Sequence, residues 1–387
     1  VFGTELDDDN LRIGDAPVRF PPIWDSTWFD WSQYNGSIEQ PMVRNIGEAL
    51  GVRARVNLDP NSDRFMESTV DIPGLHRIET MLTGDQPLQG LHSPKWPAQF
   101  GVINQSKVAA GAKLYRALCQ KCHLPPLQSD EIWDKQYWVS NDDRSMLGGF
   151  APPIRKKDFL NLPGVNLGIV GTDRRQATNF FGRYVNTGRT ILPSVTKGLW
   201  IEGRWQDSQR YDYEADPTSK ENPETELPVG VALQTVTGAI AQKYYDHQNL
   251  TREQREAYNG DRNPAARNPL EYRPRPLNGI WASPPFLHNG SVRTIYQLLS
   301  PYEERDTTFY TGTREYDRKH LGYKDEKFHG AFLFDTRVAG NQNIGHLFDS
   351  KAPGQGVIGP ELSPEERLQI LEFLKSLGPA GPPPDSP

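Results

Sequence analysis

Cysteine is scarce in this sequence of 387 residues, which contains only two, Cys119 and Cys122. So few cysteines exclude a scaffold held together by several disulfides. They also exclude a structural zinc site built from two cysteine pairs, because no second pair exists. The question that cysteine usage leaves is what this one closely spaced pair does.

Long apolar runs and clusters of one charge are also missing. No apolar run approaches the roughly 20 residues needed to cross a bilayer, so the sequence predicts no transmembrane segment. The formal net charge is −6, from 43 basic and 49 acidic residues that are spread along the chain. A chain without a basic cluster is a poor candidate for binding nucleic acid or a membrane surface. Residues 1–30 contain no signal peptide, and the chain begins with Val, so we expect a processed or truncated product.

Glycine and proline, in contrast, are abundant, with 34 and 33 residues. The mean hydropathy is −0.67, which together with this composition predicts long ordered loops between modest helices. Alternating strand patterns are rare. The length suffices for one large domain or two ordinary ones, with a substantial buried core.

The two cysteines lie in the run Cys119-Gln120-Lys121-Cys122-His123. C-x-x-C-H is the pattern to which haem c is attached. Cysteines at positions i and i+3 lie on one face of a helix, so both sulfurs can form thioethers with the vinyl groups of one porphyrin. The next residue, His123, is then the predicted iron ligand. The motif predicts one covalent haem c.

Three other interpretations of the pair are possible. A structural zinc site needs four ligands, and the sequence offers no second pair of cysteines. A thioredoxin-like dithiol normally follows a strand in a βαβ unit, whereas residues 106–118 have the periodicity of a helix. A simple disulfide would leave His123 without a function. Haem attachment is favoured over all three.

Helical patterns occur on both sides of the motif and in the middle of the chain. Residues 106–118 are expected to be a helix that ends at the motif. Ser363 to Glu366 form a capping box with proline at the first helical position, and an apolar stripe follows up to Leu377. Helical periodicity also predicts helices over 172–185 and 229–246. A haem-bearing helix crossed by a C-terminal helix is the frame of cytochrome c folds.

The second axial ligand of the iron is not fixed by these patterns. Methionine is a poor candidate because all four methionines precede residue 147. Haem iron also accepts histidine, or its sixth position stays open for chemistry. Two histidines, His288 and His346, occur beside Asn and Gly residues that favour special backbone conformations. Seven histidines other than His123 are available: His76, His92, His247, His288, His320, His329 and His346.

Four longer runs resemble one known family. Residues 274–292, PRPLNGIWASPPFLHNGSV, resemble a motif of bacterial di-haem cytochrome c peroxidase-like proteins, and among these the rubber oxygenase branch. Residues 24–36 and 45–52 resemble the same branch, as do residues 331–346. The resemblance covers most of residues 17–377.

The resemblance implies roles for three histidines. His123 matches the proximal ligand of the second, C-terminal haem of that family. His346 matches the distal ligand, so the resemblance implies bis-histidine ligation by His123 and His346. His288 is then a residue of the haem pocket or of the supporting structure. Arg183 or Arg189 is a candidate partner for a haem propionate, because arginine pairs well with carboxylates.

The sequence departs from the family in one large respect. Those proteins carry two C-x-x-C-H motifs, and the N-terminal haem is the one where substrate or oxygen reacts. This chain has one motif, and it matches the electron-transfer haem. The resemblance therefore implies the C-terminal portion of a di-haem protein, with the catalytic haem missing or supplied by a second haem-bearing chain.

These observations combine into one expected architecture. The fold is expected to be mainly α, with a cytochrome c-like haem domain, a large helical and loop insertion and few short strands. Residues 1–96 would form an aromatic-rich N-terminal extension. Residues 97–387 would form the haem domain, with the insertion at about 141–264.

The expected function is electron transfer by a c-type cytochrome, as a module or subunit of a di-haem peroxidase- or oxygenase-like system. The partner would be a redox protein or a second haem-bearing chain. The alternative is a haem-dependent oxidoreductase of peroxidase or dioxygenase type, acting on peroxide or an organic substrate. A weaker alternative is a structural or assembly subunit that retained its haem. The resemblance to bacterial c-type cytochromes implies a periplasmic or secreted protein.

Overall fold

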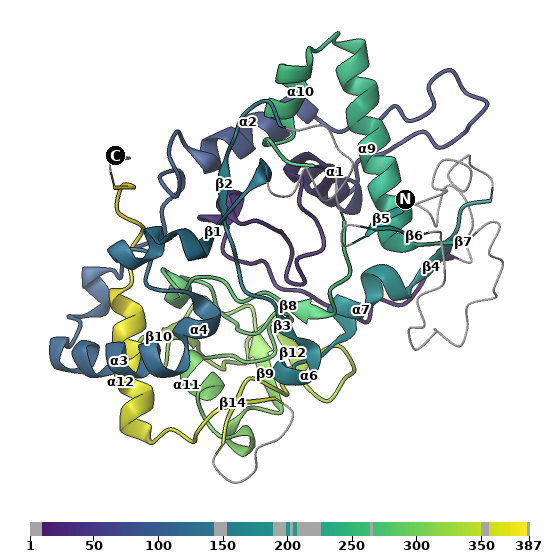
Figure 1. The fold of residues 1–387 in the computed structure, drawn as a ribbon. Helices are drawn as coiled ribbons and strands as arrows, with labels where there is room; N and C mark the ends of the chain where they lie inside the picture. Colours follow the sequence, from purple (N-terminus) through teal and green to yellow (C-terminus); the bar gives the residue numbers. More distant parts are fainter. Residues whose placement is uncertain are drawn as a thin grey trace.

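The computed structural model describes residues 10–142, 153–188, 199–201, 204–206, 226–263, 266–349 and 356–384. Figure 1 shows helices at the periphery and a centre made mostly of loops and short strands. The helices are α1 (Pro41–Gly51), α2 (Ile72–Thr83), α3 (Gln105–Leu118), α4 (Gln120–His123), α6 (Leu167–Val170), α7 (Arg175–Gly182), α9 (Val229–His247), α10 (Arg252–Tyr258), α11 (Ile295–Leu298) and α12 (Pro364–Ser376).

The strands are short and pair only two by two. Their bounds are β1 (Trp138–Ser140), β2 (Asp158–Leu160), β3 (Val165–Asn166), β4 (Tyr184–Asn186), β5 (Leu199–Ile201), β6 (Arg204–Gln206), β7 (Glu226–Pro228), β8 (Glu271–Tyr272), β9 (Thr308–Thr311), β10 (Tyr316–Asp317), β11 (Gly322–Tyr323), β12 (Phe332–Asp335), β13 (Leu347–Phe348) and β14 (Val357–Gly359). The pairs are β1–β2, β3–β8, β4–β7, β5–β6, β9–β12, β10–β11 and, in parallel, β13–β14.

The expectation of a mainly α fold with a cytochrome c-like domain is wrong. Helix accounts for 37% of the residues and strand for 13%, in small sheets, and the cytochrome c-like part is only a small portion of the chain. Helix is thus close to the share of an average globular protein. Strands of two to four residues are too short to show an alternating pattern, which is why the sequence did not reveal them. The boundaries at 96/97 and 141–264 stay predictions.

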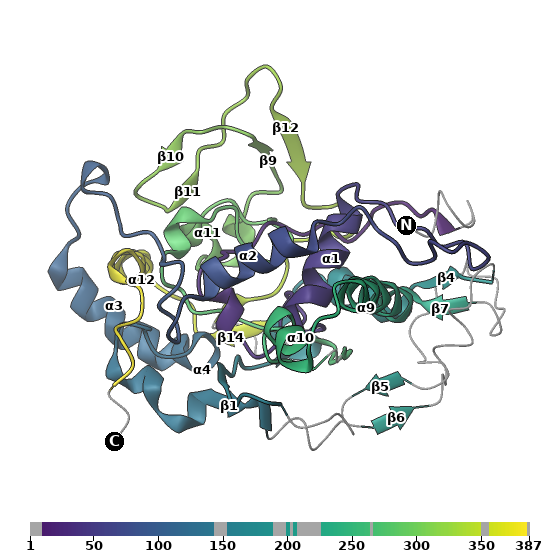
Figure 2. The ribbon, with the colours of Figure 1, turned by 90° about the horizontal axis from the view of Figure 1, so that it is seen from above.

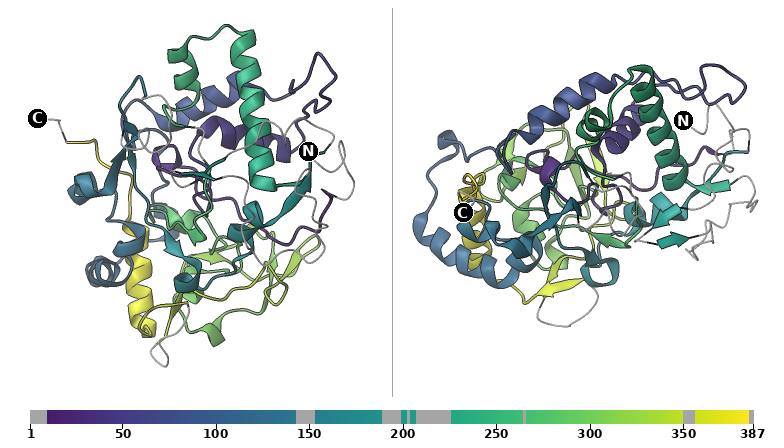
Figure 3. Two further views of the ribbon diagram at one scale, coloured as in Figure 1. Left: turned by 45° about the vertical axis from the view of Figure 1, so that its right-hand side comes forward. Right: turned by 45° about the horizontal axis from the view of Figure 1, so that its top comes forward.

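The crossing of the haem-motif helix by the C-terminal helix is present. In Figures 1 and 3 the yellow α12 lies directly beside the blue α3. A β-carbon added to Gly111 of α3 would lie 2.1 Å from the carbonyl oxygen of Gln369 and 2.9 Å from Cβ of Phe373. The two backbones therefore approach so closely that only glycine fits at this crossing. The apolar side of α12 packs with Tyr115 and with Phe286, Ile295 and Phe348 in one hydrophobic core.

A second hydrophobic core joins α1, α2 and α9. Met42 and Ile46 of α1 are fully buried against Val236 and Ile240 of α9. In Figure 1 these helices lie together at the top of the molecule, away from α3 and α12. No helix in the described part of the chain combines the length and apolar character needed to cross a membrane.

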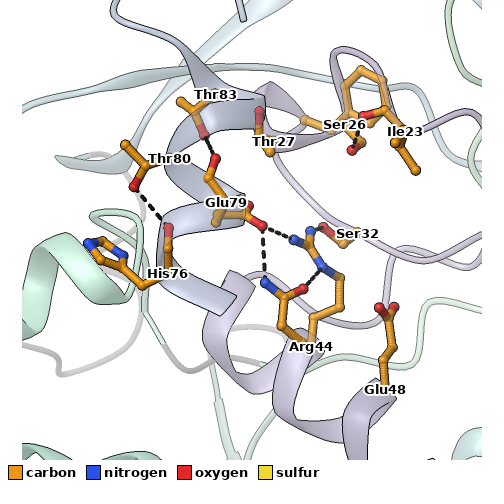
Figure 4. A network of polar contacts seen from close by, with 12 residues as sticks. Ile23, Ser26, Thr27, Ser32, Arg44, Glu48, His76, Glu79, Thr80 and Thr83 are labelled. Atoms are coloured by element: carbon orange, nitrogen blue, oxygen red, sulfur yellow. Dashed lines mark hydrogen bonds and ion pairs between the residues drawn. The ribbon is translucent and has the colours of Figure 1, made fainter. Parts of the chain in front are cut away.

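A buried polar contact connects α1 to α2 (Figure 4). The guanidinium of Arg44 donates to Glu79 Oε2 at 2.6 Å and to Ser32 Oγ at 2.9 Å. The amide of Asn45 donates to the same Glu79 oxygen at 3.1 Å. Burial alone would raise the pKa of Glu79, but Arg44 and Asn45 outweigh it and lower the pKa. The carboxylate is therefore charged and links the two helices.

Other contacts tie segments that are distant in sequence. Strand β3 pairs with β8, and Arg273, directly after β8, forms a two-pronged ion pair with Asp30. Both side chains of this pair are almost fully buried, with 4% and 2% exposed. Strands β9 and β12, with β10 and β11, form an arm that projects from the body in Figure 2.

The helix expectations are met at three places and miss at one. Helices α3, α9 and α12 form where they were predicted, and α12 begins with the expected capping box at Ser363 and Glu366. The predicted helix over 172–185 is shorter, because α7 ends at Gly182 and the chain continues as strand β4.

Candidate functional site

The two cysteines and His123 lie on a single turn that follows α3. Cys119 follows the last residue of α3 as its C-cap and is also the N-cap of α4, which ends at His123. The amides of Cys122 and His123 both donate to the carbonyl of Cys119, at 3.0 and 2.8 Å. Leu124 then adopts φ 64°, a left-handed conformation that stops the helix. This turn holds the three motif residues close together.

Neither cysteine forms a disulfide, and both are half-buried. Burial raises the pKa of the Cys119 thiol to about 12, with a smaller contribution from Cys122. Burial also raises the pKa of Cys122, against the lowering effect of Lys121. Reactive dithiols have lowered pKa values, so these thiols are unlike a thioredoxin-type pair. A zinc site gains no support either, since no group of three or more His, Cys, Asp or Glu side chains in the described residues could hold a metal ion.

A backbone carbonyl fixes the ring of His123. Its Nδ1 lies 2.7 Å from the carbonyl oxygen of Arg275. Burial lowers the pKa of His123, so the ring is neutral at neutral pH. Since a carbonyl can only accept, the proton of the neutral ring is on Nδ1 and Nε2 keeps a free lone pair. This is the tautomer and the orientation of a histidine that binds metal through Nε2.

His346 occupies the end of a loop with an unusual backbone. Its φ is 50°, and the preceding Gly345 has φ 71°. A β-carbon on Gly345 would lie 2.3 Å from the backbone of Gly171 and Thr172, so only glycine fits there. The amide of His346 donates to the carbonyl of Val170 at 2.8 Å. The loop is therefore held against α6.

One buried arginine clamps the same loop from the other side. The guanidinium of Arg305 donates to the carbonyls of Asn343, Gly345 and His346, the last two at 2.9 and 3.0 Å. Burial lowers the pKa of Arg305 to about 10, so it remains charged at neutral pH. No carboxylate in the described residues forms an ion pair with it. The positive charge is instead stabilised by carbonyl dipoles of the His346 loop.

The structure brings the rings of His123 and His346 close together. Their ring centres are 6.4 Å apart and the rings are inclined by 66°. Histidine binds a metal at about 2.0–2.1 Å, so two rings on opposite sides of one metal have centres roughly 6 Å apart. The observed separation therefore fits one metal atom between the two rings, as at a haem iron with two axial histidines.

The protonation of His346 agrees with that arrangement. Burial, with smaller contributions from His123 and Arg305, lowers its pKa to about 3. The ring is thus neutral, and its buried Nδ1 has no hydrogen-bond partner in the described residues. With the neutral His123 opposite and two free thiols on the adjacent turn, these residues fit a haem c. The assignment of Cys119, Cys122, His123 and His346 to the haem stays a prediction.

His288 is placed differently. It stacks on Tyr272 with ring centres 4.2 Å apart, and its Nε2 lies 3.0 Å from the Tyr272 hydroxyl. That hydroxyl donates its one proton to the carbonyl of Asp173 at 2.7 Å. In its contact with His288 the hydroxyl is therefore the acceptor, and Nε2 of His288 is the donor. Burial lowers the pKa of His288 to about 3. These contacts describe a neutral supporting residue, and in the described residues its ring faces neither His123 nor His346.

Sequence reasoning missed three arginines of this region, Arg19, Arg275 and Arg305. The candidates named for a propionate were Arg183, which follows α7, and Arg189, which lies outside the described residues. The available signal was weak. Arg275 lies in the proline-rich run of the motif at 274–292. Arginine is seldom buried without a partner, so an arginine among these apolar residues indicates a specific role.

Comparison with known proteins supports the haem assignment at the level of the module. Residues 271–310 match the model of a family described as RoxA-like, cytochrome c-like. This match supports a RoxA-like, haem-containing family and implies haem c.

Two relatives come from Sinorhizobium fredii. The uncharacterized protein y4iJ is 42% identical over 386 residues, which is 97% of this chain and 58% of the relative. The uncharacterized protein y4iM is 32% identical over 113 residues, 26% of each chain. The chain thus spans little more than half the length of the first relative.

Proposed function

We propose that this chain binds one haem c and transfers electrons, as a module or subunit of a larger di-haem oxidoreductase of peroxidase or oxygenase type. The observation that carries the proposal is the pair of neutral, neighbouring rings of His123 and His346, 6.4 Å apart at their centres. When bound, haem supplies an iron that gains and loses one electron. The family match supports the haem-binding module.

Each predicted site residue has a distinct task in this proposal. The thiols of Cys119 and Cys122 anchor the porphyrin. His123 and His346 would hold the iron from its two sides, and their rings would keep water and other small ligands away from it. The carbonyl of Arg275 keeps the proton of His123 on Nδ1, and Arg305 holds the His346 loop in place. A site closed on both sides favours electron transfer over reaction with a substrate.

The size of the relative supports a larger assembly. The match covers 58% of y4iJ, so the relative also contains residues outside the part that resembles this chain. We propose that a redox partner protein or a second haem-bearing chain supplies the catalytic haem. Haem c is attached outside the bacterial cytoplasm, so the proposed location is the periplasm or the outside of the cell.

Spectroscopy of the full chain tests the proposal. The wild type should carry one covalent haem, and replacement of both Cys119 and Cys122 by Ala should remove haem from the denatured chain. The wild-type EPR and absorption spectra should be low-spin and unchanged by cyanide. His346→Ala should become high-spin and bind cyanide, whereas the matched control His329→Ala, at an exposed histidine, should behave as wild type.

The opposite result has a clear meaning. A wild-type iron that is high-spin and binds cyanide would show an open axial position and remove His346 as a ligand. The haem of this chain would then be the site of peroxide or oxygen chemistry, which is the alternative oxidoreductase function.

A further inference from the structure

Arg275, whose carbonyl contacts His123, and the neighbouring Arg19 carry positive charges that no ion pair with a carboxylate in the described residues neutralises. In the described residues, neither Arg19 nor Arg275 forms an ion pair with a carboxylate. The guanidinium of Arg275 makes one hydrogen bond, from Nη1 to the carbonyl of Pro22 at 2.9 Å. Arg19 donates from Nε to the carbonyl of Leu287 at 3.1 Å and from Nη1 to Ser283 Oγ at 2.7 Å. A guanidinium has five donors, so most donors of Arg275 remain for a ligand, whereas Arg19, whose Nη1 also donates to the Ser283 carbonyl, keeps fewer.

The surroundings of the two guanidiniums do not neutralise them. Tyr34 lies beside both, but burial raises its pKa, so the phenol is neutral at neutral pH. The aromatic rings of Phe29 and Tyr34 lie 5.5 and 5.6 Å from the Arg275 guanidinium. The acidic group that acts on Arg275 from a distance is the exposed Glu48, which forms no ion pair with it. Uncompensated buried charges are unfavourable unless a ligand completes the site.

Arg19 and Arg275 lie near each other, since the charge of Arg19 is among the causes that lower the pKa of Arg275. Both side chains are half-buried and keep accessible surface. The direct hydrogen bond from His123 Nδ1 to the carbonyl of Arg275 places this arginine at the edge of the haem site.

We infer that Arg19 and Arg275 form a carboxylate-binding site that the propionates of the haem fill. The planar fork of a guanidinium matches a carboxylate, and haem carries two carboxylates. Arg275 would then make two contacts at the haem site. Its carbonyl accepts the hydrogen bond from His123, and its guanidinium would bind a propionate. Arg19 comes from the N-terminal segment, whose backbone donates from the Arg19 amide to the carbonyl of His288 at 2.9 Å. This inference rests on the proposed function, because the carboxylates belong to the proposed haem.

The test uses the haem-loaded full chain with Arg19→Gln and Arg275→Gln, and Arg64→Gln as control at an exposed arginine. Covalent haem content reports on the proposed function. The midpoint potential and the propionate bands of the resonance Raman spectrum report on the carboxylate site. Both Gln variants should keep a low-spin haem, shift the propionate bands and lower the midpoint potential, because an unneutralised propionate favours ferric iron. The control should match wild type.

Loaded Gln variants with wild-type bands and wild-type potential would overturn the inference. If the Gln variants fail to fold, Arg19→Lys and Arg275→Lys keep the charge and lose the fork. These Lys variants should shift the bands while the potential stays near that of wild type, and unchanged bands would again refute the site.

A dissolved carboxylate is the other possible source of the same chemistry. Titration of the loaded wild type with acetate should leave the propionate bands and the spectrum unchanged, because the site is already filled. Acetate binding that disappears in Arg275→Gln would show a site for free carboxylates and overturn the propionate assignment. A wild type without covalent haem would instead refute the proposed function by itself.

Discussion

Asp25 is a buried carboxyl in a left-handed turn, with φ 62°. Its Oδ2 accepts a hydrogen bond from the Asn278 amide at 2.8 Å, whereas Oδ1 has no partner. Burial raises the pKa of Asp25 from 3.8 to about 6, and the Asn278 hydrogen bond offsets only part of this effect. The folded protein therefore binds a proton more tightly here than the unfolded chain does.

The sign of the pH dependence follows from this raised pKa. Between about pH 4 and pH 6 the folded state holds the proton that the unfolded state releases, so the free energy of unfolding falls as pH rises. Asp25→Asn removes this effect, and Asn also tolerates the left-handed turn. We expect the variant to match wild type near pH 4 and to exceed it at pH 7 by up to about 3 kcal/mol.

Urea unfolding at several pH values measures the difference. Asp85→Asn, at an exposed aspartate, serves as control and should follow the wild-type profile. An Asp25→Asn variant that is less stable than wild type at pH 7 would contradict a carboxyl that is costly to ionise.

Arg305 permits a second prediction for a single side chain. One guanidinium reaches the carbonyls of Asn343, Gly345 and His346, a span that the single ammonium group of lysine cannot reproduce. Arg305→Lys should therefore loosen the His346 loop and produce a high-spin fraction that binds cyanide. Arg64→Lys is the matched control. A variant whose EPR spectrum stays fully low-spin would show that Val170 and Gly345 hold the loop without Arg305.

Single-residue chemistry was partly readable from the sequence. The motif at Cys119 to His123 predicted a turn with three adjacent functional groups, because its spacing is local. His346 emerged only through family resemblance, since nothing in the sequence places residue 346 opposite residue 123. Arg305 could not be found, because a surface arginine and a buried one look the same in a sequence.

At the scale of elements, the crossing of α3 and α12 depends on one glycine. Gly111→Ala would place a methyl group against the backbone of Gln369 and the side chain of Phe373. Although alanine favours a helix by about 1 kcal/mol over glycine, the clash should dominate and lower the free energy of unfolding by about 1–3 kcal/mol. Thermal unfolding followed by circular dichroism gives the measurement.

Gly238 in α9 is the matched control, because nothing lies within 4 Å of the position that an added β-carbon would occupy. Gly238→Ala should be neutral or more stable by about 0.5–1 kcal/mol. Equal stability of the two alanine variants would mean that α3 and α12 can separate at no cost.

Helices with strong local signals were predicted well and strands were not. The capping box at Ser363 and the long apolar pattern of α9 are encoded within a few turns. Strands β3 and β8 contain two residues each and exist only because distant segments meet. That is also why the expectation of a mainly α fold overestimated the helical share.

Across the whole molecule, the Asp30–Arg273 pair joins the N-terminal segment to the segment that matches the family model. Two hydrogen bonds of 2.8 and 3.0 Å connect the groups, and Asp30 Oδ1 also accepts from the amide of Leu162 at 3.1 Å. Asp30→Asn removes the close partner of the buried Arg273 charge and leaves it only the more distant Glu271 carboxylate at 3.8 Å, which should reduce the free energy of unfolding by about 3–5 kcal/mol. Chemical unfolding measures the loss.

Glu67→Gln provides the contrasting case, because the Arg64–Glu67 pair lies on the surface and water screens it. No measurable loss is expected there. A similar small effect of Asp30→Asn would mean that the two segments are not held together by this pair.

The overall arrangement could not be foreseen from local patterns. The recognised motif at 274–292 indicated a haem protein. The contact between Asp30 and Arg273, however, joins residues more than two hundred positions apart, and no local pattern predicts it. Abundant glycine and proline make the loops that carry these contacts, and such loops have no periodicity to interpret.

The hydrogen bond between His123 and the carbonyl of Arg275 joins residues 152 positions apart. A chain that leaves a ribosome or a translocation channel from its N-terminus presents the C-x-x-C-H turn well before Arg275, and His346 arrives later still. On the proposed function, a haem attached at once would be held by its two thioethers while its far axial position stayed open to other ligands. Biogenesis of the protein would therefore include an interval in which the haem is reactive, and its length would be set by how fast the remaining chain emerges.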